Sequence, residues 1–552
     1  MSMFSIGLSG LNAAQNALNT TSNNISNVYT PSYNRELTQL GEGRVGGGVR
    51  VDDIERQFNT YVADQLNNAK TQSSALDTYY NQVSQIDNLL ADRDAGLSPL
   101  MQTFFSSLED LASSPSDPAA RQGVLGTANT LSAQFRSFDG YLQDMQSNIN
   151  NQIKDEITQV NNTVEQIAGL NKEIALARAR TGEAPNSLLN QRDFLVSELN
   201  ERMDLRLNVQ DGKTYNISLP NGQPLVTGTS SFKLEPVQAN YDPQRTIVGY
   251  RDGGGNLIQL DESTVKGGAL GGLMTFRSET LDKTQNQVGQ LAVSLSVAFN
   301  EQHKKGVDLD GEQGGDFFNV RAPQAYSYED NSPVTIDAIE FDADAIEQLR
   351  ATDYTVSFAG GAPTVTRNDS GADVDIGTGW DAANNTLSFG GLSMTFSNTP
   401  ADGDQFEVQP VRRAANGMKV NLIDADKIAA GLPINPNDDP ADWIAAGAGD
   451  NSNALLLQDL QGQDIVGGSA SVSGAYGALV SDVGNRTNIT QVNLDARQGL
   501  TDQLRAVQQS ESGVNLDEEA ANLIRYQQFY QANARVIDTA GTIMDTILNL
   551  RN

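Results

Sequence analysis

The sequence predicts an elongated, multidomain α+β protein in which long helices bracket two strand-rich segments. Apolar residues recur at helical spacing over very long stretches, the longest running from about residue 124 to 174. The spacing switches to the alternation typical of strands within residues 205–262 and again within 325–412. The two ends of the chain carry matching heptad rows, and 552 residues are too many for a single ordinary core.

The first 34 residues predict an uncharged amphipathic helix. They contain no Asp, Glu, Lys or Arg, although the whole chain has a formal net charge of -32. Apolar residues seven apart form one row, and residues three positions further on form a second row, as at the a and d positions of a coiled coil. The first row is Phe4, Leu11, Leu18 and Ile25, and the second is Ala14, Thr21 and Val28. Pro31 ends the pattern, because the residue before a proline is pushed out of the α region.

A glycine-rich segment follows this helix. Gly41, Gly43 and Gly46 match the G-x-G-x-x-G fingerprint of dinucleotide-binding proteins. The segment leads into a strand-like stretch at 49–51 and not into a helix, so the context contradicts nucleotide binding. We therefore expect a flexible turn here.

Several helices are expected between residues 58 and 203, and they predict a rod. A Ser-Pro-Ser-Asp-Pro sequence at 114–118 separates a shorter helix at 97–112 from the long one that begins near residue 124. At about 1.5 Å per residue, an unbroken helix of that length spans many tens of ångströms. A further helix covers 188–203, with Asn186 as its expected N-cap.

The two strand-rich segments are separated by another helical stretch at 270–302. Residues 205–262 contain short alternating runs between Asn-Gly and Gly-rich turns. In the second segment, Leu387 and Phe389 precede Gly390-Gly391, which predicts a hairpin with a two-residue turn. Residues 430–453 are rich in Gly, Pro, Asn and Asp and predict an exposed loop.

The C-terminal segment mirrors the first helix. One heptad row is Leu516, Leu523, Tyr530, Ile537 and Met544, and the companion row is Ala520, Ala534, Gly541 and Leu548. Because most helix stability comes from packing an apolar face, each end needs a partner, and the other end is the obvious one. The uncharged outer face of such a pair suits burial between neighbouring subunits. An ordinary helical hairpin within the chain is the alternative.

These patterns divide the chain into four domains with the termini outermost. The nested order predicts that the termini lie at one end of a rod and the β segments at the other. The divisions are a terminal coiled coil of residues 1–34 with 513–552, a mainly helical rod of 35–204 with 263–324 and 413–512, a small β subdomain of 205–262 and an inserted outer β domain of 325–412.

Composition excludes several classes of function. The chain has 69 acidic and 37 basic residues, and such a surface repels nucleic acids and anionic membranes. It has no cysteine, which excludes disulfides, thiolate metal sites and cysteine nucleophiles. This absence fits chance in an acidic protein and equally fits a protein exported unfolded. The N-terminus lacks the basic region of a Sec signal, so any export is expected to proceed without a cleaved signal of that type.

Motifs at both ends resemble those of flagellar rod, hook and hook-associated proteins. They are Gly10–Gln15, Ser22–Asn27, Thr30–Arg35, Ser512–Glu519 and Tyr526–Ala534. Further motifs resemble, within that group, the family of first hook-associated proteins, which form the hook–filament junction. These are Pro118–Gln122, Leu189–Val196, Gly271–Ser278, Phe299–His303 and Ser473–Tyr476. The resemblance spans nearly the whole chain and is weakest at 325–412.

The resemblance implies a structural subunit of the bacterial flagellum. Such proteins are exported unfolded by the flagellar type III apparatus, self-assemble through terminal helices that form the inner tube, and project their β domains outward. Expected partners are further copies of the chain, hook protein on the proximal side, the second hook-associated junction protein on the distal side, and a cytoplasmic export chaperone at the C-terminal region. The alternatives are another axial protein of the flagellum, or an extracellular binding module carried by 325–412.

No residue pattern points to an enzyme, a cofactor or a metal site. His303 is the single histidine and ends a helical pattern, so a helix cap or a surface position is expected for it. Asp308, Asp310, Glu312 and Asp316 form an acidic turn, but Gly311 comes too early for an EF-hand. We interpret this turn as solvated, with weak cation binding as the alternative.

Overall fold

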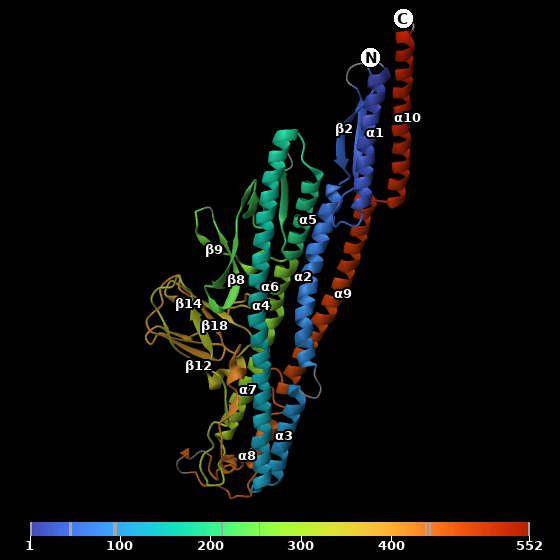
Figure 1. Cartoon of the computed structure of the whole chain (residues 1–552). Coiled ribbons are helices and arrows are strands. Elements are labelled where there is room, and N and C mark those ends of the chain that lie inside the picture. Colours follow the sequence, from blue (N-terminus) through green and yellow to red (C-terminus); the bar gives the residue numbers. More distant parts are fainter. Residues whose placement is uncertain are drawn as a thin grey trace.

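The computed structural model shows an elongated molecule with both termini at one end (Figure 1). It describes residues 3–43, 47–91, 96–210, 214–252, 254–436, 439–440 and 443–549. The β domains lie along the flank of the rod and not at its far end, so the expected layout is wrong on that point. The far end is built by α3 (Leu97–Ser113) and α8 (Ser452–Asp459). The outer β domain is held at the flank because its core packs against Val293 and Val297 of the rod helix α7 (Asp282–His303).

The rod is organised around one very long helix, α4 (Pro118–Thr181). Its 64 residues give a length of about 96 Å. Asp117 caps it by accepting a hydrogen bond from the Ala119 amide, and Gly182, at φ 86°, ends it in the left-handed conformation. The other rod helices are α2 (Thr60–Leu90), α5 (Asn186–Arg202), α6 (Gly268–Phe276), α7 (Asp282–His303) and α9 (Val472–Ser512). Asn186 is the first residue of α5 and Pro185 its N-cap, which corrects the expected cap.

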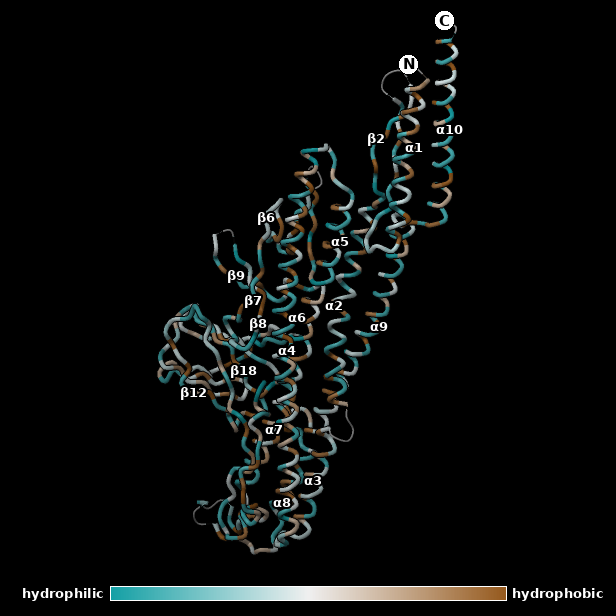
Figure 2. Tube along the Cα trace, in the orientation of Figure 1, coloured by the Kyte–Doolittle hydropathy of each residue, from teal (hydrophilic) through white to brown (hydrophobic). Residues whose placement is uncertain are grey.

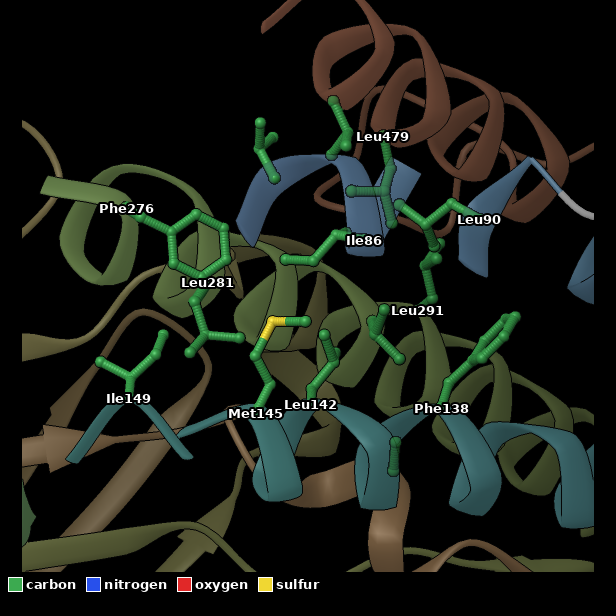
Figure 3. Packing of buried hydrophobic residues seen from close by; sticks show 14 of the residues in the cluster. Ile86, Leu90, Phe138, Leu142, Met145, Ile149, Phe276, Leu281, Leu291 and Leu479 are labelled. Carbon is green, nitrogen blue, oxygen red and sulfur yellow. The ribbon is translucent and has the colours of Figure 1, made fainter. Parts of the chain in front are cut away.

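One hydrophobic core runs through the rod and joins helices that are far apart in sequence. Figure 3 shows α2, α4, α6, α7 and α9 contributing side chains to the same cluster. The labelled members are Ile86, Leu90, Phe138, Leu142, Met145, Ile149, Phe276, Leu281, Leu291 and Leu479. Figure 2 shows hydrophobic and hydrophilic residues interleaved along the long helices. In the described ranges, no helix combines the length and the hydrophobicity that crossing a membrane requires.

The helical stretch expected at 270–302 is interrupted by a short π-helix. Residues Arg277–Leu281 form this π turn between α6 and α7. The Arg277 side chain is fully buried there and pairs with Glu262, which lies between β9 (Leu257–Gln259) and α6.

Two small antiparallel sheets form the first β domain. The sheet order is β3-β4-β5-β6 in one and β7-β8-β9 in the other. The strands are β3 (Arg206–Gln210), β4 (Thr214–Ser218), β5 (Pro224–Thr227), β6 (Ser230–Ser231), β7 (Leu234–Ala239), β8 (Asp242–Arg251) and β9 (Leu257–Gln259).

Two four-stranded sheets enclose the core of the outer β domain. Phe389 pairs with Leu392 across Gly390-Gly391, whose φ angles of 53° and 80° allow a two-residue turn, so the predicted hairpin is confirmed. The sheet orders are β11-β18-β13-β14 and β12-β17-β16-β15. The strands are β11 (Gln324–Ser327), β12 (Ile336–Phe341), β13 (Tyr354–Ala359), β14 (Ala362–Arg367), β15 (Trp380–Asp381), β16 (Thr386–Phe389), β17 (Leu392–Phe396) and β18 (Gln405–Gln409). A separate two-stranded sheet pairs β10 (Phe318–Asn319) with β19 (Lys419–Val420).

The terminal region contains α1 (Met3–Ser26), a hairpin and α10 (Leu516–Asn549). The hairpin pairs β1 (Glu36–Glu42) with β2 (Val49–Arg56). Gly46 of the glycine motif lies outside the described residues. In the described part of the segment, β1 is followed by β2 and not by a helix. A dinucleotide site needs a strand followed by a helix, and that arrangement is missing from the described part of the segment.

Candidate functional site

Helices α1 and α10 lie side by side in opposite directions and form what we call the terminal pair (Figure 1). A Cβ atom built on Gly7 lies 2.8 Å from Ile537 Cγ1, and one built on Gly10 overlaps Asn533 Oδ1. The two helices therefore approach more closely at these glycines than a larger side chain permits. The buried positions of α1 are small or polar, namely Gly7, Gly10, Ala13, Ala14, Ala17, Thr20, Thr21 and Asn24.

In the single chain the two predicted heptad rows of α1 are buried to different degrees. Ala14 and Thr21 of the second row are buried. Of the first row and its C-terminal counterpart, Leu11, Leu18, Ile25, Leu523 and Ile537 are half-buried, whereas Phe4, Leu516, Tyr530 and Met544 are exposed. Ile537 of the C-terminal row contacts Gly7 across the pair. The distance between the axes of two packed helices depends on the side chains at the contact. A face of glycine and alanine allows a shorter distance than a face of leucine and isoleucine. Packing of these nine residues between subunits stays a prediction.

The outer surface of α1 carries no charge, and the open end of the terminal pair exposes large apolar side chains. α1 has no charged residue from Met3 to Ser26, and its exposed middle and last turns are mostly Asn, Gln and Ser. Phe4 and Met544, at the open end, are 51% and 59% exposed. Met3, Ile6, Leu8, Ile543, Ile547 and Leu548 are exposed in the same turns, and Ile524 is exposed about 30 Å away, toward the start of α10. α10 has 34 residues against 24 in α1, so its last turns extend past the start of its partner.

A buried polar cluster, which we call the terminal joint, connects the terminal pair to the rod. Glu519 is 1% exposed and accepts hydrogen bonds from Arg35 Nε at 2.8 Å and from Asn24 Nδ2 at 3.1 Å. Asn24 also donates to the Glu36 carbonyl at 2.8 Å and accepts from the Glu36 amide at 3.0 Å and the Tyr33 hydroxyl at 2.9 Å. Three of the terminal motifs thus meet in one network. Burying the Glu519 carboxylate would be costly without partners, and the hydrogen bonds of this network supply them.

Burial shifts the titration of two groups beside this network. It raises the pKa of the Tyr33 phenol, which therefore stays protonated and donates to Asn24. It also raises the pKa of the Glu36 carboxyl. Both groups take part in the contacts that hold the network together, so the cluster acts as a structural connection.

Backbone bonds fix the chain where α9 gives way to α10. The Arg35 amide donates to the Ser512 carbonyl at 2.8 Å, and the Gln57 amide donates to the Arg35 carbonyl at 2.7 Å. Asn34 donates through Nδ2 to Asn190 Oδ1 at 2.7 Å. The motif around Asn190 therefore belongs to the same joint, on the rod side.

The hairpin β1–β2 covers α1. Thr38 donates its hydroxyl to Thr20 at 2.8 Å, and the Val49 amide donates to Ser9 Oγ at 3.2 Å. Ser9 and Thr20 thus bond the hairpin, and each also donates its hydroxyl to a carbonyl of its own helix, Ile6 and Asn16 respectively.

The single histidine is an interior structural residue. His303 is fully buried at the end of α7, accepts a hydrogen bond from the Ala429 amide on Nε2 at 2.9 Å, and bonds the Gly315 carbonyl through Nδ1 at 2.7 Å. Nδ1 must therefore carry the proton. Burial lowers its pKa to about 4. The expected surface position is wrong, because the loops around 315 and 429 fold over it.

The acidic turn already holds a cation of the chain. The Lys427 ammonium lies 3.1 Å from Asp308 Oδ2, 2.9 Å from Asp310 Oδ2 and 2.5 Å from Glu312 Oε2. Asp316 pairs instead with Lys304, at 2.8 Å. Across the described ranges, no group of three or more His, Asp or Glu side chains is arranged to hold a metal ion.

Sequence reasoning missed the residues that make the contacts of the terminal pair and the joint. Gly7 lies in no motif and Gly10 only begins one, although glycines one turn apart on an apolar helix are a signal of close helix approach. Asn24, Arg35 and Glu519 stand within motifs that were noticed, but nothing local indicates that they meet.

Family models match four parts of the chain. The model of the flagellar hook-associated protein FlgK helical domain matches residues 83–318. The model of the flagellar hook-associated protein 1 D2-like domain matches 329–410. The ends match the models of the flagella basal body rod protein at 4–33 and of the flagellar basal body rod FlgEFG protein C-terminal region at 508–550.

Similarity to relatives extends over the full length. The chain is 42% identical over 559 residues to Flagellar hook-associated protein 1 of Salmonella typhimurium, covering 100% of both chains. It is 24% identical over 581 residues to the Bacillus subtilis protein of that name, covering 98% of this chain and 96% of the relative. Among solved structures, the flagellar hook junction protein FlgK from Burkholderia pseudomallei matches with a TM-score of 0.74 and 28% identity, covering 81% of this chain and 100% of that one.

Proposed function

The chain belongs to the family of flagellar hook-associated protein 1, and from this premise we propose that its terminal pair is the part that polymerises. It is a structural, hook-associated junction protein of the bacterial flagellum. Another axial position, such as hook or rod, is not favoured, because the full-length relatives share the hook-associated name.

One observation carries the proposal: α1 has no charged residue and the open end of the terminal pair exposes large apolar side chains, on a chain with a net charge of -32. Soluble proteins rarely leave contiguous apolar surface open unless a partner covers it. A partner that is itself acidic, such as a second copy, is repelled everywhere except at such a patch. The terminal pair is therefore the surface on which copies of this chain can meet.

The residues of the predicted rows have a place in this arrangement. Phe4, Leu516, Tyr530 and Met544 are open in the single chain and would be covered in the assembled structure. Leu11, Leu18, Ile25, Leu523 and Ile537 flank the contact between α1 and α10 and would be buried further by a neighbouring copy. The rod of 35–204, 263–324 and 413–512 would then carry the β domains of 205–262 and 325–412 away from the axis.

The finer identity of the partners belongs to the same proposal. We infer hook protein on the proximal side, the second hook-associated junction protein on the distal side, and a cytoplasmic export chaperone at the C-terminal region. Export as an unfolded chain through the flagellar type III apparatus fits a protein without cysteine, since no disulfide has to form outside the cell.

Deletion of either end tests the proposal. Removal of residues 1–27, or of 526–552, should leave the rod folded and abolish incorporation at the end of the hook. The measurements are circular dichroism of the purified chain, swimming in soft agar, and detection of the protein on isolated hooks. Normal motility with either deletion would refute it.

A matched pair of point variants separates assembly from general surface effects. Ile524→Asp on α10 and Leu176→Asp on α4 alter side chains that are 56% and 50% exposed. Only Ile524→Asp should prevent incorporation, because a charge in a buried interface is costly. Equal loss with both variants would show that the apolar surface of the terminal pair has no special role.

A further inference from the structure

A buried network of charges lies where the rod meets both β domains. Arg412 follows β18 and is 8% exposed. Its guanidinium bonds Asp353 of the outer β domain, lies 3.3 Å from Asp282 Oδ1 of α7, and lies 3.9 Å from Asp242 Oδ2 of β8. One side chain thus connects three parts of the molecule that are separate in sequence.

A second arginine extends the network toward the first β domain. Arg245 of β8 pairs with Asp282 at 2.6 Å and with Glu262 at 2.7 Å. Arg277 of the π turn bonds the same Glu262. Asp282 is therefore shared between Arg245 and Arg412, and moving either β domain breaks a bond to the rod.

The network contains more carboxylates than guanidinium groups, and one carboxylate has no arginine of its own. Glu407 of β18 is 5% exposed and accepts hydrogen bonds only from neutral groups among the described residues, Asn368 Nδ2 at 2.7 Å and Thr355 Oγ1 at 3.3 Å. The charged and titratable groups that face it from the surrounding elements are Tyr241, Arg245, Tyr328, Asp353 and Arg412.

This site opens onto a cleft between the rod and the β domains. The cleft has a volume of about 760 Å³, and its lining includes Arg245, Asp353, Glu407 and Arg412. Water and hydroxide can therefore reach the joint without unfolding of either domain.

We propose that this joint is a pH-sensitive lock that holds the outer β domain in one orientation on the rod while Glu407 is protonated and loosens when Glu407 ionises. The charged form of Glu407 is unfavourable in this buried position and stands beside Asp353, so ionisation favours an arrangement in which the joint opens to water. Contacts that do not titrate, such as Gln290 Nε2 to the Leu349 carbonyl at 2.7 Å, keep the domain tethered. Ionisation therefore widens the range of orientations of the outer β domain on the rod and does not unfold the domain.

The titration of the network agrees with this geometry. Burial, followed by the charge of Asp353, raises the pKa of Glu407 to about 8. Burial also raises the pKa of Asp353. A carboxyl with a raised pKa is neutral below that pKa and charged above it, so the lock is closed near neutral pH and loosens as the pH rises through about 8.

Distance measurements between two spin labels test the lock in the full chain. The chain has no cysteine, so Lys154→Cys on α4 and Ala382→Cys in the outer β domain provide two exposed and specific labelling positions. The distance distribution should be narrow at neutral pH and broaden with a midpoint near pH 8. Glu407→Gln should remain narrow at alkaline pH, whereas Glu340→Gln, an exposed carboxylate of the same domain, should respond as the parent does.

A second pair of variants examines the arginine. Arg412→Gln should broaden the distribution at every pH, and Arg367→Gln, which removes an ion pair confined to the outer β domain, should not. Trp380 fluorescence reports whether that domain remains folded, and if Arg412→Gln unfolds it, the Glu407 comparison decides alone. A width that does not change between neutral and alkaline pH, or a change that persists in Glu407→Gln, would overturn the proposal.

Discussion

Glu519→Gln should open the terminal joint and leave the rod intact. Glu519 is 1% exposed and accepts one hydrogen bond from the Arg35 guanidinium and one from Asn24. Hydrogen bonds to charged groups contribute about 1.5–3 kcal/mol each, and breaking a buried ion pair costs about 3–5 kcal/mol. Glutamine keeps the shape and one acceptor oxygen, so we expect a loss of about 2–4 kcal/mol in the stability of the joint.

Glu518→Gln is the matched control, because Glu518 binds the same arginine from the next position. Its carboxylate accepts from Arg35 Nη1 at 2.8 Å, but its side chain is 58% exposed. An ion pair open to water contributes about 0–1 kcal/mol. The two variants therefore change the same charge next to the same partner and differ in burial.

Hydrogen exchange of the full chain measures the difference. Peptides covering residues 20–43 contain the bonds of Asn24, Arg35 and Glu36, and their exchange should accelerate by about 30- to 1000-fold in Glu519→Gln, since each 1.4 kcal/mol is about a factor of ten. In Glu518→Gln the increase should stay below about fivefold. If exchange accelerated equally in both variants, or not at all in Glu519→Gln, the conclusion that the buried Glu519 carboxylate stabilises the terminal joint would be refuted.

Three further outcomes are expected from the same reasoning. Gly289→Ala should destabilise the chain by about 1–3 kcal/mol in urea unfolding, because its Cβ overlaps the Val411 carbonyl, whereas Gly140→Ala, with open space around it, should stabilise α4 by about 1 kcal/mol. The pKa of His303 is lowered to about 4, so the neutral side chain contributes about 3 kcal/mol to the free energy of unfolding, and this contribution should be lost as the pH falls from 6.5 toward 4. In His303→Gln the urea midpoint should therefore change less over this pH range, and a profile identical to that of the parent would contradict the assignment. Gly10→Val should separate α1 from α10 and abolish incorporation into hooks while rod stability is unchanged, and normal incorporation would show that the close approach is dispensable.

Local pattern predicted the long helices and the strand-rich segments well. The stretch from Pro118 to Thr181 forms one helix because its apolar residues keep the helical period throughout and Asp117 and Gly182 supply the ends. The hairpin at Gly390-Gly391 followed from two glycines between alternating strands. Both features depend on residues within a few positions of one another.

Heptad spacing did not by itself identify the closest contact of the terminal pair, although Ala14 and Thr21 of the second row are buried. Heptad spacing selected Leu11 and Leu18, because large apolar residues have the strongest periodic signal. The structure turns α1 so that Gly7 and Gly10 face α10 instead. Which face is used depends on how close the partner can come, and that is a property of both helices together.

Motifs, charge and periodicity are local properties, and they were enough to predict the family, the uncharged N-terminal helix, the long rod helices and the two strand-rich segments. Only the folded chain shows that the β domains lie along the flank, that Asn24, Arg35 and Glu519 form one buried joint, and that Asp282, Asp353 and Arg412 meet. These contacts join residues far apart in the chain, and a buried charge is stable only where its partners converge in space. No local pattern encodes that convergence.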